Sequence, residues 1–269
     1  MQNNIFEKKK LQPHSFLNSF CQAILFLFFV AISNLSIAQN NRINNTTQIW
    51  TEVDFLGKIS PKLKWQCDVQ YSKQSDYEAF DFYNHPEQLT IRPWLHYYIT
   101  PTIRMSTFFG LWYNYPIDAV GQREYPEYRW AAQLQFYKIW NRNKISNRFR
   151  PEIRAIKDRN GIFETVFRGR YMFKYMRLLN HDNYDKNSWY FIFQNEIFIN
   201  GGSTTTGFKA FDQNRIFLGI GYNITDDIAF ETGYFNQFQH HNHDVNFDNN
   251  NVWQVSLIFD NLTHPQSKK

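Results

Sequence analysis

Apolar and polar side chains alternate along much of the chain, and this period of two most limits how the chain can fold. The stretch LKWQCDVQYS (63–72) has apolar or aromatic side chains at every odd position, including Trp65, Val69 and Tyr71, and polar ones at every even position. Successive side chains of a β-strand point to opposite faces. The stretch therefore predicts a strand with one apolar face and one polar face.

The alternation recurs in eleven segments of about ten residues each, close to the ~9–11 residues that a membrane-crossing strand needs. These segments are 48–55, 63–72, 88–99, 103–114, 127–136, 145–154, 167–175, 189–200, 213–222, 228–238 and 253–259.

The connections between these segments alternate in length. Short turns at 60–62, 100–102, 141–144 and 223–227 alternate with longer polar segments at 73–86, 116–126, 157–164, 201–210 and 240–249. Short turns on one side and long loops on the other are typical of outer-membrane barrels. The long segment 179–188 is an exception, because it falls on the short-turn side.

These patterns predict an all-β fold, an antiparallel up-and-down transmembrane β-barrel. Bacterial single-chain barrels have even strand numbers, and the last predicted strand runs toward the short-turn side. We therefore expect about twelve strands, with ten as the fallback, and residues 40–47 as the source of the missing first strand.

Composition supports a barrel over other membrane proteins. The chain is 19% aromatic, yet its mean hydropathy is −0.56, which excludes a helical membrane protein. A barrel that meets lipid outside and a polar lumen inside explains both values. The alternative is a secreted soluble β-sandwich or lipocalin-like binding barrel that buries its apolar face.

The N-terminus reads as an export signal. Lys8, Lys9 and Lys10 precede the apolar run 20–32, and the small residues Ser36 and Ala38 follow it. This pattern predicts a cleaved signal peptide over 1–38, a single barrel domain over 39–269 and a location in the bacterial outer membrane.

Charge and cysteine content limit the partners. One cysteine, Cys67, remains after cleavage, so the fold cannot depend on an internal disulfide. The formal net charge of +5 falls further with the signal, which is too low to indicate nucleic acid as a partner. Outer-membrane lipid is the expected partner. No glycine-rich phosphate loop or paired-cysteine metal site is present, and no cofactor is expected.

Four stretches carry a family resemblance: FRPEIR (149–154), FQNEIFIN (193–200), FDQNRIFLGIGYNI (211–224) and FETGYFNQFQ (230–239). With them, the chain resembles the domain-of-unknown-function 2490 family of secreted proteins from Bacteroidetes-like bacteria. The resemblance implies an outer-membrane barrel. It implies no activity and no catalytic residues.

The polar strand faces gather charge on the side that would point inward. The set is Arg148, Arg150, Glu152, Arg154, Arg168, Arg170, Lys174, Glu196, Arg215 and Glu231. Hairpins centred near 160 and 205 would place Glu152 opposite Arg170 and Glu196 opposite Arg215, at ion-pair distance. Two interpretations remain open: a structural network that fills the lumen, and a lumen whose positive charge favours small anions.

Two further groups of residues could carry chemistry. The turn at Pro101 would set His96 across from Ser106, a base and a nucleophile of the kind that lipid hydrolases use, although no orienting acid is visible. The tract HHNHD (240–244) offers imidazoles and a carboxylate that could hold a metal or could form a solvated loop.

The sequence thus favours an outer-membrane barrel of unassigned activity, with passive passage of small solutes or a structural role. A lipid-modifying hydrolase and a secreted soluble binding barrel remain as alternatives, and an enzymatic role is less favoured than a non-enzymatic one.

Overall fold

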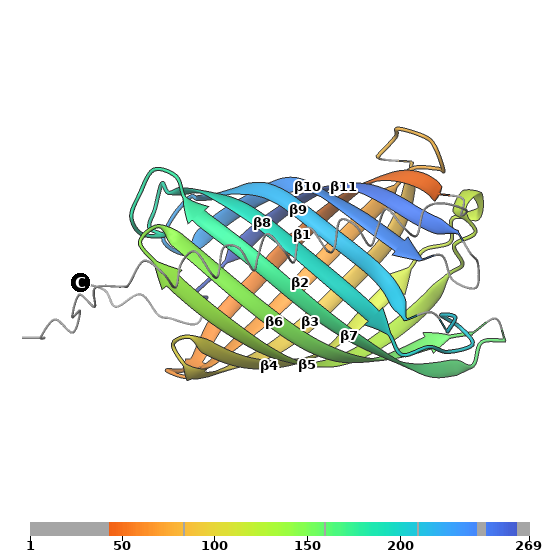
Figure 1. The fold of residues 1–269 in the computed structure, drawn as a ribbon, viewed down its shortest axis with the longest axis horizontal. Coiled ribbons are helices and arrows are strands. Elements are labelled where there is room, and N and C mark those ends of the chain that lie inside the picture. Colours follow the sequence, from red (N-terminus) through yellow and green to blue (C-terminus); the bar gives the residue numbers. More distant parts are fainter. Residues whose placement is uncertain (1–42, 83, 159, 209, 241–245, 263–269) are drawn as a thin grey trace, which may run out of the picture. The chain divides into compact units, whose positions relative to one another are not determined.

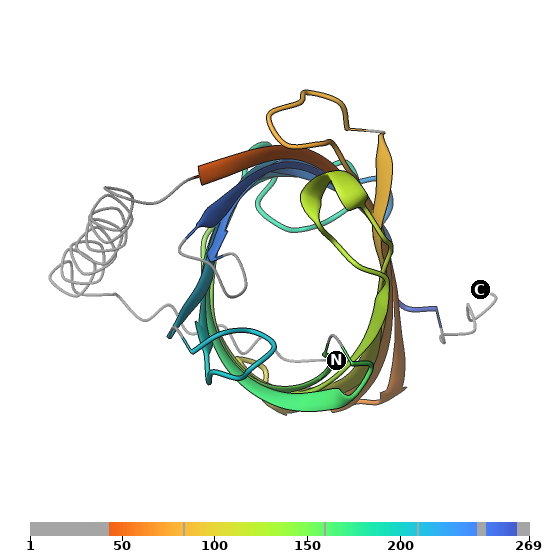
Figure 2. The same ribbon diagram turned by 90° about the vertical axis from the view of Figure 1, so that its right-hand side faces the viewer.

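The computed structural model describes residues 43–82, 84–158, 160–208, 210–240 and 246–262, which form a closed β-barrel (Figures 1 and 2). The predicted signal peptide lies outside the described residues. The eleven strands are β1 (Ile43–Ser60), β2 (Leu63–Gln74), β3 (His85–Thr100), β4 (Ile103–Asn114), β5 (Tyr125–Trp140), β6 (Asn143–Lys157), β7 (Phe163–Leu178), β8 (Trp189–Asn200), β9 (Phe211–Asn223), β10 (Ile228–His240) and β11 (Phe247–Phe259). One short 3-10 helix, η1 (Asp118–Val120), lies between β4 and β5. No helix within the described ranges is long and apolar enough to cross a membrane.

Neighbouring strands in sequence pair antiparallel, and β1 closes the barrel by pairing parallel with β11, from Ile43 opposite Phe247 to Phe55 opposite Phe259. The expectation of twelve strands, or ten, is wrong. Both closing strands start at the same end of the barrel, so an odd strand number closes without an extra strand. Residues 43–47, expected to belong to a separate strand, instead extend β1. Closure satisfies both sheet edges.

The strands contain 12 to 18 residues, and all but β4 and β8, which have the predicted bounds, are longer than the sequence pattern indicates. Strands β1, β10 and β11 continue into polar stretches where both faces carry amides, so the period of two is lost there. On the outer surface of these polar stretches, Asn236 donates to Asn249 at 2.6 Å, and Asn249 donates to Asn45 at 2.9 Å. These hydrogen bonds join β10, β11 and β1.

The predicted sorting of faces is confirmed. In β2, Asp68, Gln70 and Ser72 are buried inside the barrel, while Tyr71 is 37% exposed on the outside. Every strand carries at least one large exposed apolar side chain. Examples in strand order are Phe55, Tyr71, Leu95, Phe109, Trp130, Phe149, Phe167, Trp189, Leu218, Tyr234 and Trp253.

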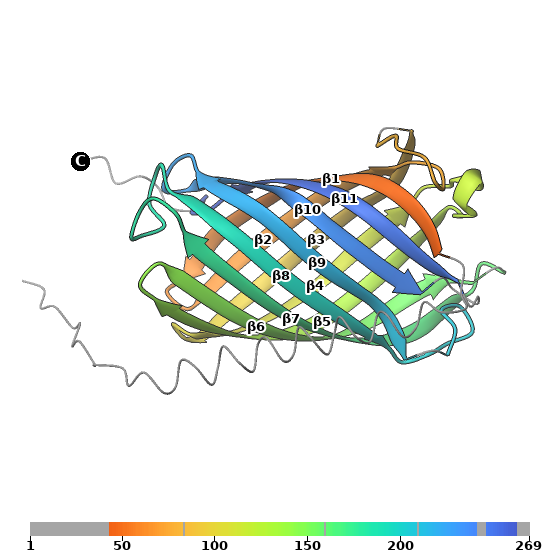
Figure 3. The same ribbon diagram turned by 45° about the horizontal axis from the view of Figure 1, so that its top comes forward.

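The connections divide the barrel into two ends. The loop end carries the described parts of the longer segments, at 75–82, 115–124, 160–162 and 201–208, and the turn end carries the segments 61–62, 101–102, 141–142 and 224–227 (Figures 1 and 3). This alternation agrees with the sequence prediction. The strands are tilted relative to the barrel axis (Figure 3).

The exceptional segment 179–188 lies at the turn end and packs inward. Tyr184 contacts a buried cluster in the lumen, with its ring 5.5 Å from that of Tyr190. Burial raises the pKa of the Tyr184 hydroxyl to about 12. The backbone N–H of Asn187 donates to the carbonyl of Asn223 at 2.8 Å, which ties the segment to the end of β9.

Apolar side chains fill much of the lumen. One cluster comprises Trp50, Leu178, Tyr190, Ile192, Phe217, Phe235 and Val252. A second comprises Trp94, Phe108, Trp112 and Ala131. The apolar side chains of this protein therefore lie on both sides of the barrel wall.

Candidate functional site: an arginine-lined chamber

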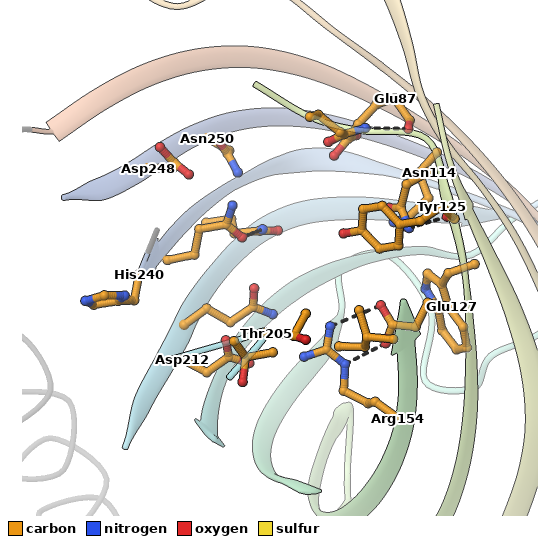
Figure 4. Close-up of a pocket in the computed structure, with 18 of the residues that line it drawn as sticks. Glu87, Asn114, Tyr125, Glu127, Arg154, Thr205, Asp212, His240, Asp248 and Asn250 are labelled. Carbon is orange, nitrogen blue, oxygen red and sulfur yellow. Dashed lines mark hydrogen bonds and ion pairs between the residues drawn. The ribbon is translucent and has the colours of Figure 1, made fainter. Parts of the chain in front are cut away.

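The loop-end half of the lumen contains a chamber of about 780 Å³ (Figure 4). Its wall includes residues from η1 and from the loop segment 201–210, so it lies at the loop end. Eight basic side chains line it against five acidic ones. The remainder of the wall is mostly amides, hydroxyls and aromatic rings.

One wall of the chamber is built on Glu127 of β5. Arg154 of β6 donates to it through Nε at 2.6 Å and Nη2 at 3.1 Å (Figure 4), and Arg129 donates to it through Nη2 at 3.0 Å. The Arg129 guanidinium also lies 3.9 Å from the ring centroid of Trp112. Two arginines thus compensate one buried carboxylate, and the face of Trp112 stabilises one of those arginines.

Three guanidinium groups surround the ring of Phe198 at the floor of the chamber. Those of Arg170, Arg215 and Arg168 lie 4.2, 4.9 and 5.2 Å from its centroid. All four residues line the chamber. Like charges come this close only where carboxylates or aromatic faces offset their repulsion.

Carboxylates below the floor hold Arg168 and Arg170. Glu152 accepts from Arg168 Nη2 at 2.6 Å and from Arg170 Nη1 at 2.7 Å. Glu196 accepts from Arg170 Nε at 2.9 Å and also pairs with Arg148. Arg168 reaches Asp212 at 3.2 Å as well.

The register explains which of the expected pairs form. Glu152 lies opposite Arg168 rather than Arg170, and Arg170 reaches it diagonally. Glu196 does lie opposite Arg215, as predicted, but its ion pairs are with Arg148 and Arg170. Guanidinium groups reach across more than one register position, so parity alone cannot assign partners.

The other members of the predicted charge set lie elsewhere in the lumen. Arg150 donates to Gln133 at 2.7 Å and lies 4.8 Å from the ring centroid of Trp94. Lys174 Nζ lies 3.9 Å from a carboxylate oxygen of Glu231, to which Tyr190 also donates. Neither Lys174 nor Glu231 lines the chamber. The chamber therefore uses only part of the set.

An acidic cluster on β1 and β2 was not singled out from the sequence. Carboxylate oxygens of Glu52, Asp54 and Asp68 lie within 4.8 Å of one another. Arg92 of β3 partly neutralises them, with 2.9 Å to Glu52 and 3.4 Å to Asp68. The signal that could have found it is the hairpin at Pro61, which places Asp54 opposite Asp68.

His96 and Ser106 lie opposite each other, as the turn at Pro101 predicted, with His96 Nδ1 2.8 Å from Ser106 Oγ. Gln66 Oε1 takes the place of an orienting acid, 2.8 Å from His96 Nε2. Both His96 and Ser106 are buried and neither lines the chamber. The pair fills the lumen beneath Trp94, whose ring stacks on His96.

The HHNHD tract is only partly described. His240 ends β10 and lines the chamber (Figure 4), but residues 241–244 lie outside the described residues.

The fold and chamber define a class: single-chain closed β-barrels with a polar, arginine-lined chamber above a lumen packed with apolar clusters. Within it, the chain belongs to the family described as "Protein of unknown function (DUF2490)", whose sequence pattern it matches over residues 47–248. The match runs from within β1 to the start of β11, which confirms the family resemblance. No curated protein matches the chain.

Proposed function

We propose that the protein is an outer-membrane β-barrel that admits a small water-soluble solute into its loop-end chamber and is not an open diffusion pore. The observation that carries the proposal is the outer surface, where large apolar side chains are exposed on all eleven strands. A soluble monomer rarely exposes an apolar patch of more than a few hundred Å². An apolar belt around the whole circumference matches hydrocarbon as its solvent.

Outward-facing hydroxyls support the same conclusion. Thr51, Thr107 and Thr232 each donate at 3.0 Å to a backbone carbonyl on the next strand. A hydroxyl in water has no need of such a partner, whereas one in hydrocarbon costs free energy unless it is hydrogen-bonded. The tyrosine hydroxyls of Tyr171 and Tyr175 likewise donate to asparagines of β6.

The unequal ends give the barrel an orientation. Outer-membrane barrels place short turns in the periplasm and long loops outside the cell. The loop end would then face the exterior, and a solute would enter the chamber from outside. The apolar clusters in the lumen, which include the almost fully buried Ile192, Val252 and Ala131, favour a blind chamber over free diffusion.

A protease-accessibility experiment tests location and orientation together. A cleavage site for a specific protease is inserted either in the loop segment 201–210 or in the turn segment 224–227, and intact cells of a Gram-negative host are treated. We expect cleavage of the first variant on intact cells, and of the second only after the outer membrane is opened. The protein should also need detergent for extraction. A monomer that dissolves without detergent would overturn the proposal.

A further inference from the structure

The floor of the chamber holds a cation with no carboxylate at ion-pair distance among the described residues. Arg92, Arg129, Arg154, Arg168 and Arg170 all line the chamber, and each lies within 4.0 Å of a carboxylate oxygen. Arg215 lies within that distance of none among the described residues, and its buried Nε has no hydrogen-bond partner there. The one carboxylate opposite it in register, Glu196, is taken by Arg148 and Arg170.

Aromatic faces hold the Arg215 guanidinium in place. Its Cζ lies 4.9 Å from the ring centroid of Phe198, 5.1 Å from that of Trp50 and 5.9 Å from that of Phe235. Rings stabilise a cation through their faces, but they leave its in-plane N–H donors available. Arg215 is therefore positioned to donate to a further acceptor.

A matching acceptor lies on the next strand. Gln237 of β10 is the register partner of Arg215 and also lines the chamber. Its Nε2 donates to Gln239 at 2.6 Å, but its buried Oε1 has no partner among the described residues. Side by side, the chamber offers a cationic donor and a neutral acceptor that do not satisfy each other.

The local charge favours an anion. Around Phe198, the five guanidinium groups of Arg148, Arg150, Arg168, Arg170 and Arg215 meet the three carboxylates of Glu152, Glu196 and Asp212. Glu87 adds a fourth carboxylate that acts on Arg215, which leaves one positive charge in excess. This excess positive charge is largely buried away from bulk water, so water and salt screen it only weakly. A bound anion would relieve this repulsion.

The upper wall suits hydroxyl groups. Gln48, Gln74, Asn114, Gln213 and Asn250 line it with amides, which both donate and accept hydrogen bonds. The chamber volume lies within the ~300–1,000 Å³ of small-molecule sites.

We propose that Arg215 and Gln237 form the floor of a binding site for a sugar-sized hydroxylated anion. A carboxylate or phosphate oxygen accepts from Arg215, and a hydroxyl of the same molecule donates to Gln237 Oε1. Amides of the upper wall bind its remaining hydroxyls. The inference rests on the chamber being open to solute, as the proposed function requires.

The test is calorimetric titration of the full-length protein in detergent, at constant ionic strength, with four probes: glucuronate, glucose 6-phosphate, glucose and inorganic phosphate. We expect at least one sugar anion to bind, and at least tenfold more tightly than glucose or phosphate. The two sugar anions distinguish a carboxylate from a phosphate as the charged group. Arg215→Gln should weaken that binding at least tenfold, and Arg215→Lys should weaken it less.

Two further variants separate the roles. Gln237→Leu should reduce the preference for the sugar anion over phosphate, because it removes the hydroxyl acceptor. Arg142→Gln changes an arginine that pairs with Asp182 at the turn end and should leave binding unchanged. Heat-dependent mobility on gels checks that each variant keeps a folded barrel.

The result that would overturn the inference is a folded wild-type barrel that binds none of the sugar anions. Equal affinity for phosphate and the sugar anions, or equal binding by wild type and Arg215→Gln, would also overturn it. Because titration in detergent does not depend on which membrane holds the barrel, such a failure would leave the proposed location and orientation intact.

Discussion

Glu152 shows how a charge becomes tolerable at the centre of this barrel. Its side chain has no exposed surface, and both carboxylate oxygens accept from arginines, at 2.6 Å from Arg168 and 2.7 Å from Arg170. The desolvation of three charged groups is offset only while all three are present. Removal of the carboxylate would leave two buried guanidinium groups facing each other.

We predict that Glu152→Gln destabilises the barrel by about 3–5 kcal/mol, the usual cost of breaking a buried ion pair. The matched control is Asp182→Asn at the turn end, whose carboxylate is 81% exposed and pairs with Arg142 at 2.6 Å. This control should cost about 1 kcal/mol or less, because water and salt screen the pair. Equilibrium unfolding in urea, followed by tryptophan fluorescence in lipid vesicles, measures both. Equal costs for the two variants would contradict the structural importance of the network.

At the scale of strands, Gly233 permits close approach between β9 and β10. A Cβ atom at this position would lie 2.4 Å from the carbonyl oxygen of Leu218 and 2.6 Å from the Cα of Gly219. Both are backbone atoms, so no side-chain rotation could relieve the clash. The glycines of these strands thus leave room for the inward rings of Phe217 and Tyr190.

Gly233→Ala should therefore destabilise the barrel by about 1–3 kcal/mol through overpacking. Gly169 is a suitable control, because a Cβ there would meet nothing within 4 Å. Gly169→Ala should be neutral or stabilise by about 0.5–1 kcal/mol, since alanine loses less backbone entropy on folding. The urea concentrations at the unfolding midpoints of the two variants, compared with that of wild type, measure these changes in stability. A Gly233→Ala barrel as stable as wild type would argue against this packing of β9 on β10.

The parallel seam between β1 and β11 can be tested by crosslinking. Val53 and Leu257 are register partners on the outer face, and neighbouring strands lie ~4.8 Å apart, within disulfide reach. In a Cys67→Ser background, Val53→Cys with Leu257→Cys should crosslink on oxidation. Val53→Cys with Trp253→Cys, four residues or ~13 Å away along the strand, should not. If neither pair crosslinks, a further strand separates β1 from β11.

At this scale, the sequence predicted which face of a strand each side chain occupies, but it did not predict how the first and last strands pair. Alternation placed Arg148, Arg170 and Glu196 on the inner face, because each residue's side depends only on local parity. The strand number was wrong because a parity rule for bacterial barrels overrode a count of eleven, and pairing between the first and last strands leaves no local signal. The rings of Phe108 and Phe198 were also missed as lumen fillers, since an inward aromatic looks like an interruption of the pattern.

At the scale of the whole barrel, opposite charges occupy opposite walls. Basic side chains gather on β6 to β9, while Glu52, Asp54 and Asp68 lie on β1 and β2, about half-way round the strand order. Trp94 connects the two groups: its indole N–H donates to Asp68 at 2.8 Å, and its ring lies under the Arg150 guanidinium. This arrangement fills the lumen and separates the chamber from the packing beneath it.

A filled lumen has a direct consequence for conductance. Ions cross a barrel only through a continuous water path, and Trp94 and Phe108 pack with ring centroids 4.4 Å apart in the lumen. We predict that the reconstituted wild-type protein shows little or no conductance in planar bilayers, and that Trp94→Ala with Phe108→Ala raises it. The control is Phe109→Ala with Trp130→Ala, which removes rings of similar size from the outer face of the neighbouring strands β4 and β5. It should leave conductance unchanged, because those rings lie outside the wall. A large wild-type conductance would mean that the lumen is open and that the barrel passes solutes rather than holding them.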